Sequence, residues 1–312
     1  GSLNFYMFHG GTNFGFQNGA NHTDGVYHPT TTSYDYCALL SECGDLTPAY
    51  HAVRELLGAK GPLTVTDSPK AAYGPVRLTE QASLLPQADR LATPIRSAQT
   101  QTMEQLGQDF GFTLYRTTLR GPFTGVPLEL GRVHDRAVVF LDGKHIGTVE
   151  RSRRKDPMPL TLAAGQTAML EILVENMGRV NYGSKLLDKK GLLDGVRLDM
   201  QYHFGWEMLC LPMEDLHGLQ WSDTADGPRF LRGSLTIDDA PKDTFLRLDH
   251  FTRGFVLING FNIGRFYTPA GPQKTLYVPA PLLHQGENEI IVFESDDLHS
   301  PVVEFVDTPE LG

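Results

Sequence analysis

The first sixty residues change from an apolar stretch to a long polar loop and then to an amphipathic segment. Residues 3–9 are mostly apolar, which is typical of a parallel strand buried on both faces. Residues 10–44 are rich in turn-forming residues and predict a loop. Residues 47–57 predict a helix, with Thr47 as its N-cap, Pro48 in its first turn and Gly58 at its end. This order indicates one βα unit with its loop at the carboxyl end of the strand.

After Lys60 the pattern changes to short apolar and β-branched runs between turn signals, which is typical of β-sandwiches. An apolar strand, an Asp-Gly or Asn-Gly turn and a returning strand occur at 138–147 and again at 255–264. A second match relates 171–175 to 289–292. We therefore expect a mainly β chain with sandwiches at 98–215 and 216–312. Residues 61–97 are expected to be a linker with bridging strands, and 1–60 a separate N-terminal unit.

Composition and charge exclude several classes of function. The net charge of −10 disfavours binding to nucleic acid or to an anionic membrane, and no apolar run approaches the roughly 20 residues of a membrane helix. The 11 histidines lack metal-ligand spacing, and no GxGxxG motif follows the first strand, so neither metal nor cofactor is expected. Cys37, Cys43 and Cys210 predict free buried thiols, with a Cys37–Cys43 disulfide as the alternative.

Acidic residues between the loop and the helix are the local candidates for acid–base chemistry. Asp35, Glu42 and Asp45 lie close together in sequence, but acidic residues at such positions usually brace a loop or a helix start. We therefore assign no catalytic residue. At the end of the first strand, His9 and Asn13 either shape a pocket floor or stabilise the backbone of a glycine-rich turn, and the second reading is favoured.

Two tryptophans and a basic run invite functional interpretations. Trp206 lies among apolar residues and is expected in a sandwich core, whereas Trp221 is the better candidate for an exposed stacking platform. A short basic run is expected to form a solvated hairpin loop, and consists of Arg151, Arg153, Arg154 and Lys155.

Several ordered motifs resemble one known family. They lie at 4–16, 32–36, 40–47, 178–183, 205–207, 259–266 and 271–279, and include Gly10-Gly11-Thr12-Asn13-Phe14-Gly15 and Tyr34-Asp35-Tyr36. Together they closely resemble family 35 of the glycoside hydrolases, the β-galactosidases. Cys37 and Cys43 depart from the usual pattern, in which an Asp and a small residue occupy these positions. The loss of an acidic group beside Tyr36 puts the substrate preference in doubt.

The resemblance implies a (β/α)8 barrel followed by jelly-roll, galactose-binding-like β-sandwiches. Residues 3–9 and 47–57 would then be the last strand and helix of the barrel. Barrel strands one to seven and both catalytic glutamates would be absent from this chain, so the chain alone is expected to be inactive. By the same resemblance, Tyr36 would contact the galactose moiety of a β-galactoside, with Tyr34 as a second candidate.

Two functional readings follow. The chain is either the C-terminal part of a retaining β-galactosidase or a non-catalytic carbohydrate-binding or structural module. Homo-oligomerisation stays open. So does the compartment, cytoplasmic or secreted, because residues 1–15 show no signal peptide but the true N-terminus is expected to be missing. One strand and one helix cannot bury both faces of a parallel unit, so we expect 1–60 to be poorly packed.

Overall fold

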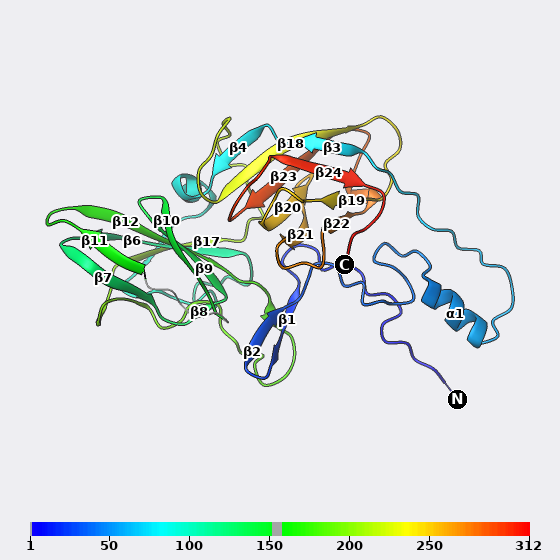
Figure 1. Cartoon of the computed structure of the whole chain (residues 1–312), viewed down its shortest axis with the longest axis horizontal. Coiled ribbons are helices and arrows are strands. Elements are labelled where there is room, and N and C mark those ends of the chain that lie inside the picture. The colour runs from blue at the N-terminus through cyan, green and yellow to red at the C-terminus, as the bar shows by residue number, and fades with distance from the viewer. Residues whose placement is uncertain (1, 152–157) are drawn as a thin grey trace.

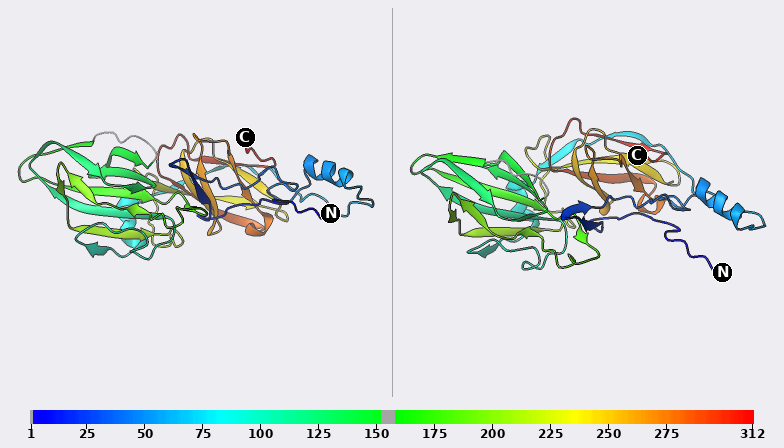
Figure 2. Two further views of the ribbon diagram at one scale, coloured as in Figure 1. Left: turned by 90° about the horizontal axis from the view of Figure 1, so that it is seen from below. Right: turned by 60° about the horizontal axis from the view of Figure 1, so that its bottom comes forward.

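The computed structural model describes residues 2–151 and 158–312, and the fold is mainly β, as predicted. Two β-sandwiches lie side by side along the long axis of the molecule, and the N-terminal segment runs along one side of them (Figure 1). Helix α1 (Pro48–Leu56) lies away from both sandwiches at one end of the molecule (Figure 2).

The first sandwich is formed by the middle of the chain. Its larger sheet contains β10 (Lys144–Glu150), β9 (Arg136–Leu141), β12 (Thr167–Glu175), β6 (Phe112–Arg120), β17 (Trp206–Leu211) and β5 (Ile95–Ser97), in that spatial order. The facing sheet contains β11 (Met158–Leu162), β7 (Phe123–Leu130), β15 (Val196–Leu198) and β16 (Gln201–Tyr202). A short pair, β14 (Gly191–Leu192) and β8 (Val133–His134), adds to the same core. Trp206 is buried in this core, as the sequence predicts.

The second sandwich repeats this plan. One sheet contains β21 (Phe261–Tyr267), β20 (Arg253–Ile258), β23 (Gly286–Glu294), β18 (Arg229–Ile237) and β4 (Glu80–Ser83). The facing sheet contains β22 (Thr275–Val278), β19 (Thr244–Arg247), β24 (Val302–Val306) and β3 (Gly74–Arg77), and a 3₁₀ turn, η2 (Ala280–Leu282), follows β22. All neighbouring strands in both sandwiches are antiparallel.

The predicted internal repeat is visible as two equivalent hairpins. Asp142-Gly143 joins β9 to β10, and Asn259-Gly260 joins β20 to β21, and all four residues have positive φ. This is the backbone that a tight two-residue hairpin turn requires. In both turns the side-chain oxygen of the first residue accepts a backbone N–H from the neighbouring strand, at 2.8 Å from Met169 and 2.9 Å from Glu289.

A third apolar core joins the two sandwiches. It combines residues from the outer face of the six-stranded sheet with residues from β18, β20 and β23. The rings of Phe112, Phe255 and Phe293 meet here, with the centroids of Phe255 and Phe293 5.2 Å apart. Since both faces of β12 are therefore covered, its run of apolar residues does not alternate with polar ones.

Residues 61–97 contribute to both sandwiches. They supply β3 and β4 to the second and β5 to the first. Between these strands lie η1 (Leu85–Gln87) and a short helix, α2 (Ala88–Leu91), which pack Leu85 and Ala88 into the core between the sandwiches.

Helix α1 has the predicted signals. The Thr47 side chain accepts the backbone N–H of Tyr50, and Gly58 follows the helix with a positive φ. Its expected apolar face is not covered, however, because the helix buries none of its residues and Leu56 is 84% exposed. The expectation of poor packing therefore holds for this helix.

The strand expected at 3–9 does not form. Within the described residues, this stretch makes only one isolated bridge, between His9 and Leu40, and Tyr6 is 79% exposed. A parallel strand is stable only with neighbours along its edges, and hydrophobicity alone does not provide them. The loop expected at 10–44 instead contains a hairpin of β1 (Gly19–Thr23) and β2 (Val26–Pro29). Strand β1 also pairs in parallel with β13 (Arg179–Val180).

Candidate functional site

The two tyrosines proposed from the sequence lie on a loop that is tightly attached to the glycine-rich turn. Tyr34 donates its backbone N–H to the carbonyl of Gly11 at 2.9 Å, and Asn13 donates to Thr32 at 2.7 Å. Gly10 lies against this loop so closely that a Cβ atom there would be 1.5 Å from the Tyr34 carbonyl oxygen. The glycine is therefore required by close approach of two backbone segments.

The side chains of Tyr34 and Tyr36 lie together at the surface. Their ring centroids are 5.4 Å apart, with 33° between the ring planes. Tyr36 is 61% exposed and has a φ of 58°, while Tyr34 is half-buried. Neither ring belongs to an apolar core of the described residues. The pair therefore lies at an accessible part of the surface.

An open groove of about 1180 Å³ begins at these tyrosines. One wall comes from the N-terminal segment, including Tyr6 and Asn13, and the other from the first sandwich, including Asn181 and Tyr182. Tyr182 is 62% exposed. Its position in the groove was not predicted, although it lies in one of the motifs that carry the family resemblance.

The groove contains little acidic chemistry. Asp109 is the one carboxylate among its described lining residues, and Arg179 is the one cation. Hydrolysis with retention needs two carboxyl groups about 5–5.5 Å apart. The described lining thus offers aromatic rings, amides and hydroxyl groups for binding, without a second carboxylate for that chemistry.

Glu42 and Asp35 brace the tyrosine loop from within. Glu42 is buried, and its carboxylate accepts a hydrogen bond from the Thr12 hydroxyl at 2.7 Å. Burial raises the pKa of Glu42, although the Thr12 and Ser33 hydroxyls oppose the effect. Asp35 accepts the backbone N–H of Glu42 at 3.1 Å. These contacts agree with the bracing role expected from the sequence.

Asp45 also has a bracing role. Burial alone would raise its pKa, but hydrogen bonds from the Lys70 ammonium and the Cys43 thiol outweigh burial and hold the pKa below its usual range. Asp45 also accepts the backbone N–H of Ser68, so it connects the loop before α1 to the chain that follows the helix. The Asp45–Lys70 ion pair therefore fixes the loop, and the ionised Asp45 carboxylate has no proton to donate.

Other residues of the opening motif make structural contacts. The His9 ring lies 3.1 Å from the carbonyl oxygen of Glu42, and the Asn13 amide donates to the carbonyl of Thr31 at 3.1 Å. Phe14 packs edge-on against Phe261 of the second sandwich, with ring centroids 5.4 Å apart. Gly11 and Gly15 have positive φ, as a glycine-rich turn requires.

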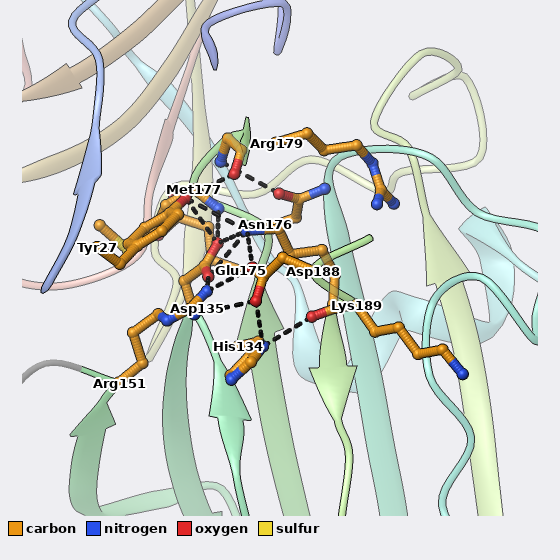
Figure 3. A network of polar contacts seen from close by, with 12 residues as sticks. Tyr27, His134, Asp135, Arg151, Glu175, Asn176, Met177, Arg179, Asp188 and Lys189 are labelled. Carbon is orange, nitrogen blue, oxygen red and sulfur yellow. Dashed lines mark hydrogen bonds and ion pairs between the residues drawn. The ribbon is translucent and has the colours of Figure 1, made fainter. Parts of the chain in front are cut away.

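A buried polar network ties the N-terminal segment to the first sandwich (Figure 3). The Tyr27 hydroxyl, on β2, donates to the Gly178 carbonyl at 2.6 Å and lies 3.0 Å from a carboxylate oxygen of Asp135. The Lys190 ammonium, wholly buried, lies 2.7 Å from Asp135. Arg151 lies 2.8 Å from Asp135 and 2.7 Å from Asp188.

This network corrects the prediction for the basic run. Arg151 is held in buried ion pairs and lies with its guanidinium 4.3 Å from the centre of the Tyr27 ring, so it is not solvated. Its acidic partners are far away in sequence, and nothing near Arg151 indicates them. Arg153, Arg154 and Lys155 lie outside the described residues.

Other expectations can be compared with the structure directly. All three cysteines are free, but Cys37 is exposed, because it follows Tyr36 in the open loop. The alternative Cys37–Cys43 disulfide is therefore wrong.

Trp221 is half-buried beneath the guanidinium of Arg232, at 4.3 Å, and so is not an open stacking platform. Across residues 2–151 and 158–312, no group of acidic, histidine and cysteine side chains could hold a metal ion. No helix in the same ranges is long and apolar enough to cross a membrane.

Three segments of the chain match family models. Residues 1–60 match the family model of the glycosyl hydrolases family 35. Residues 100–213 match the first all-β domain of β-galactosidase, and 228–288 match its galactose-binding domain.

Curated relatives match over nearly the whole chain. Human β-galactosidase-1-like protein 2 is 40% identical over 100% of this chain and 50% of its own length. A β-galactosidase of Xanthomonas manihotis is 43% identical over 89% of this chain and 47% of its own. Human β-galactosidase is 38% identical over 100% of this chain and 51% of its own length. The chain thus spans about half the length of these relatives.

Similarity to solved structures is weak. A β-glucuronidase of Bacteroides uniformis has a TM-score of 0.24 and 16% identity, covering 61% of this chain and 22% of its own, which supports no inference. The family models and the relatives agree with the motifs of the tyrosine loop and with the repeated sandwiches. The chain belongs to family 35 of the glycosyl hydrolases, and it carries the all-β and galactose-binding domains of the β-galactosidases.

Proposed function

We propose that this chain is part of a retaining β-galactosidase that hydrolyses terminal β-galactosides through a glycosyl-enzyme intermediate. The chain supplies one wall of the galactose pocket, with Tyr36 as the principal contact and Tyr34 beside it. The observation that carries the proposal is the pair of tyrosines, Tyr36 exposed and Tyr34 half-buried, on a braced loop at the edge of an open groove.

We further propose that the two catalytic carboxylates are not in this chain. The lining of the groove supports this, since Asp109 is its one described carboxylate, and Glu42 and Asp45 are engaged in bracing contacts. Barrel strands outside this chain would bring the acid/base and the nucleophile to the tyrosines. The order of the chain, from the tyrosine loop to the sandwiches, fits that arrangement.

A turnover assay tests this division of roles. The 312-residue chain is expected to release no chromophore from a chromogenic β-galactoside above the uncatalysed background. Glu42→Gln and Asp35→Asn variants serve as controls for the carboxylates nearest the tyrosines. Hydrolysis by the unaltered chain that either substitution abolishes would overturn the proposal.

A second candidate is a non-catalytic carbohydrate-binding module. It is favoured by the match of residues 228–288 to a galactose-binding domain. Calorimetry with galactose and lactose separates the two candidates when it is done on the chain and on Tyr36→Ala. Binding that requires Tyr36 supports the pocket wall, whereas binding that is unchanged in Tyr36→Ala supports a module in the sandwiches. Tyr202→Ala, another half-exposed tyrosine outside the groove, is the matched control.

A further inference from the structure

A second pocket adjoins the tyrosine groove, and the two share Asn18 and residues 29–31 as lining. Its volume is about 160 Å³, and its walls come from residues 29–32, from the end of β12 and from the chain between β21 and β22. Asn18 and Arg253 line it as well. The tyrosines of the groove do not take part in it.

The pocket is cationic, although the chain as a whole carries a net charge of −10. Its charged lining residues are three bases and one acid, namely Arg253, Arg265, Lys274 and Glu175. The single carboxylate is already neutralised, because Arg253 donates to it at 2.8 Å and Arg265 at 3.0 Å. The pairing with these arginines outweighs burial and lowers the pKa of Glu175, so the carboxylate stays ionised and the positive excess persists.

Arg253 has hydrogen-bonding capacity that the protein does not use. The residue is 4% exposed, and its Nε atom donates to Glu175. No described residue accepts a hydrogen bond from its two terminal nitrogens, and Nη1 is buried. The Tyr267 ring, 4.3 Å from the guanidinium carbon, fixes the plane of the group. A buried guanidinium with free N–H groups is costly unless an acceptor satisfies them.

Neighbouring atoms extend this donor array. Lys274 uses one of its three N–H groups on the carbonyl of Thr268 at 2.9 Å and keeps the others. Arg265 is half-buried, and its Nε atom is shielded from solvent and unpartnered among the described atoms. The cavity is too small for a disaccharide, since pockets for larger organic ligands occupy roughly 300–1,000 Å³. Size, charge and free donors thus indicate a compact acceptor of negative charge.

We propose that this pocket binds a compact oxyanion, namely the carboxylate of a small sugar acid or an inorganic sulfate, through Arg253 and Lys274. Charge-assisted bonds from a guanidinium to an oxyanion are about twice as strong as neutral ones, which favours such a ligand over neutral galactose. The three basic lining residues, Arg253, Arg265 and Lys274, lie within the residues 228–288 that match the galactose-binding domain model, so galactose is the natural competitor in a test.

Calorimetry on the full chain at constant ionic strength tests the proposal, with sodium sulfate, sodium galacturonate and galactose as separate titrants. Sulfate or galacturonate is expected to bind, and galactose is expected to give at least tenfold weaker affinity. Binding of sulfate alone identifies a free inorganic ion as the ligand, and tighter binding of galacturonate identifies a sugar acid. The absence of binding by both anions, or equal binding of galactose, overturns the proposal.

Substitutions locate the binding. Arg253→Gln is expected to weaken anion affinity about tenfold or more, which is the size of one charge-assisted hydrogen bond. Lys274→Gln, at a less central position, is expected to weaken it at least threefold and decides the matter where Arg253→Gln fails to fold by circular dichroism. Arg247→Gln removes one positive charge outside the pocket and should keep the original affinity. Unchanged affinity in folded Arg253→Gln or in Lys274→Gln contradicts the assignment.

Discussion

Lys190 and Tyr27 make a buried contact between the first sandwich and the N-terminal segment, with the ammonium 3.3 Å from the hydroxyl. The Lys190 ammonium is wholly buried, and burial lowers its pKa despite the neighbouring Asp135 carboxylate. The Tyr27 hydroxyl shares that carboxylate and also satisfies the Gly178 carbonyl. Breaking a buried polar set is costly, because the groups left behind stay desolvated.

Tyr27→Phe is therefore expected to lower the free energy of unfolding by about 1–3 kcal/mol, since it removes the hydroxyl and keeps the ring beneath Arg151. Urea denaturation of the chain measures the loss. Tyr202→Phe, on the exposed strand β16, is the control and should change stability by less than about 0.5 kcal/mol. A loss in Tyr27→Phe no larger than in the control would contradict the role given to the hydroxyl.

Glu175 carries a pH dependence of known sign. Its folded-state pKa is depressed by Arg253 and Arg265, so the stability that it contributes is present above the ordinary pKa of 4.5 and is lost as the pH falls below it. Glu175→Gln should cost about 3–5 kcal/mol near pH 7, because it leaves two buried arginines without their carboxylate.

Urea midpoints of the original chain and of Glu175→Gln at pH 7, 5 and 3.5 check this expectation. The difference between the two proteins should be largest at pH 7 and should shrink at pH 3.5. Glu304→Gln, which removes a half-exposed carboxylate that pairs with Arg247, is the control for a general effect of charge. A difference that stays constant down to pH 3.5 would show that Glu175 is not the titrating group.

The two repeated hairpins depend on the same turn chemistry. Gly143 and Gly260 have φ values of 72° and 79°, where a side chain is strained. Gly143→Ala and Gly260→Ala should each lower the free energy of unfolding by about 1–2 kcal/mol. Thermal or urea denaturation gives the values, with exposed Lys144→Ala in the adjacent position as control. Similar losses in both variants support equivalent turns, and a neutral result at either position would contradict it.

Local signals predicted the elements that local interactions form. Thr47 and Gly58 marked the ends of α1, the Asp-Gly and Asn-Gly pairs marked the hairpins, and the apolar context of Trp206 placed it in a core. Pairings between distant segments were not predictable in this way. Asp24-Gly25 is a turn signal for the β1–β2 hairpin, but the residues on either side are mostly polar and do not show the apolar alternation that predicts strands.

In the candidate site, too, the sequence indicates the local features but not the contacts between distant segments. The family motif located Tyr34 and Tyr36, and the structure brings them together. It also places Tyr182 on the facing wall of the groove, although this residue comes much later in the sequence, after β12. The strand at 3–9, which hydrophobicity and the family resemblance both predict, does not form, because a strand needs partners that a local pattern does not describe.

At the scale of the whole molecule, the N-terminal region has two unequal parts. The β1–β2 hairpin is fastened to the first sandwich by Tyr27, whereas α1 buries no residue. Brief trypsin treatment should therefore cleave near Arg54 and Lys60 well before it cleaves within the strands of the two sandwiches. Size-exclusion chromatography of the nicked chain should show the two fragments still associated through the hairpin. Resistance of the 54–60 region in the isolated chain would contradict this prediction.

The phenylalanine-rich core between the sandwiches has a practical consequence for dissecting the molecule. Phe112 belongs to one sandwich, and Phe255 and Phe293 belong to the other. Each sandwich shields the apolar face of the other from water. A fragment that contained only one sandwich would expose a broad apolar surface, so it should aggregate or dimerise when it is expressed alone. The two sandwiches are therefore expected to fold as one unit despite their separate sheets.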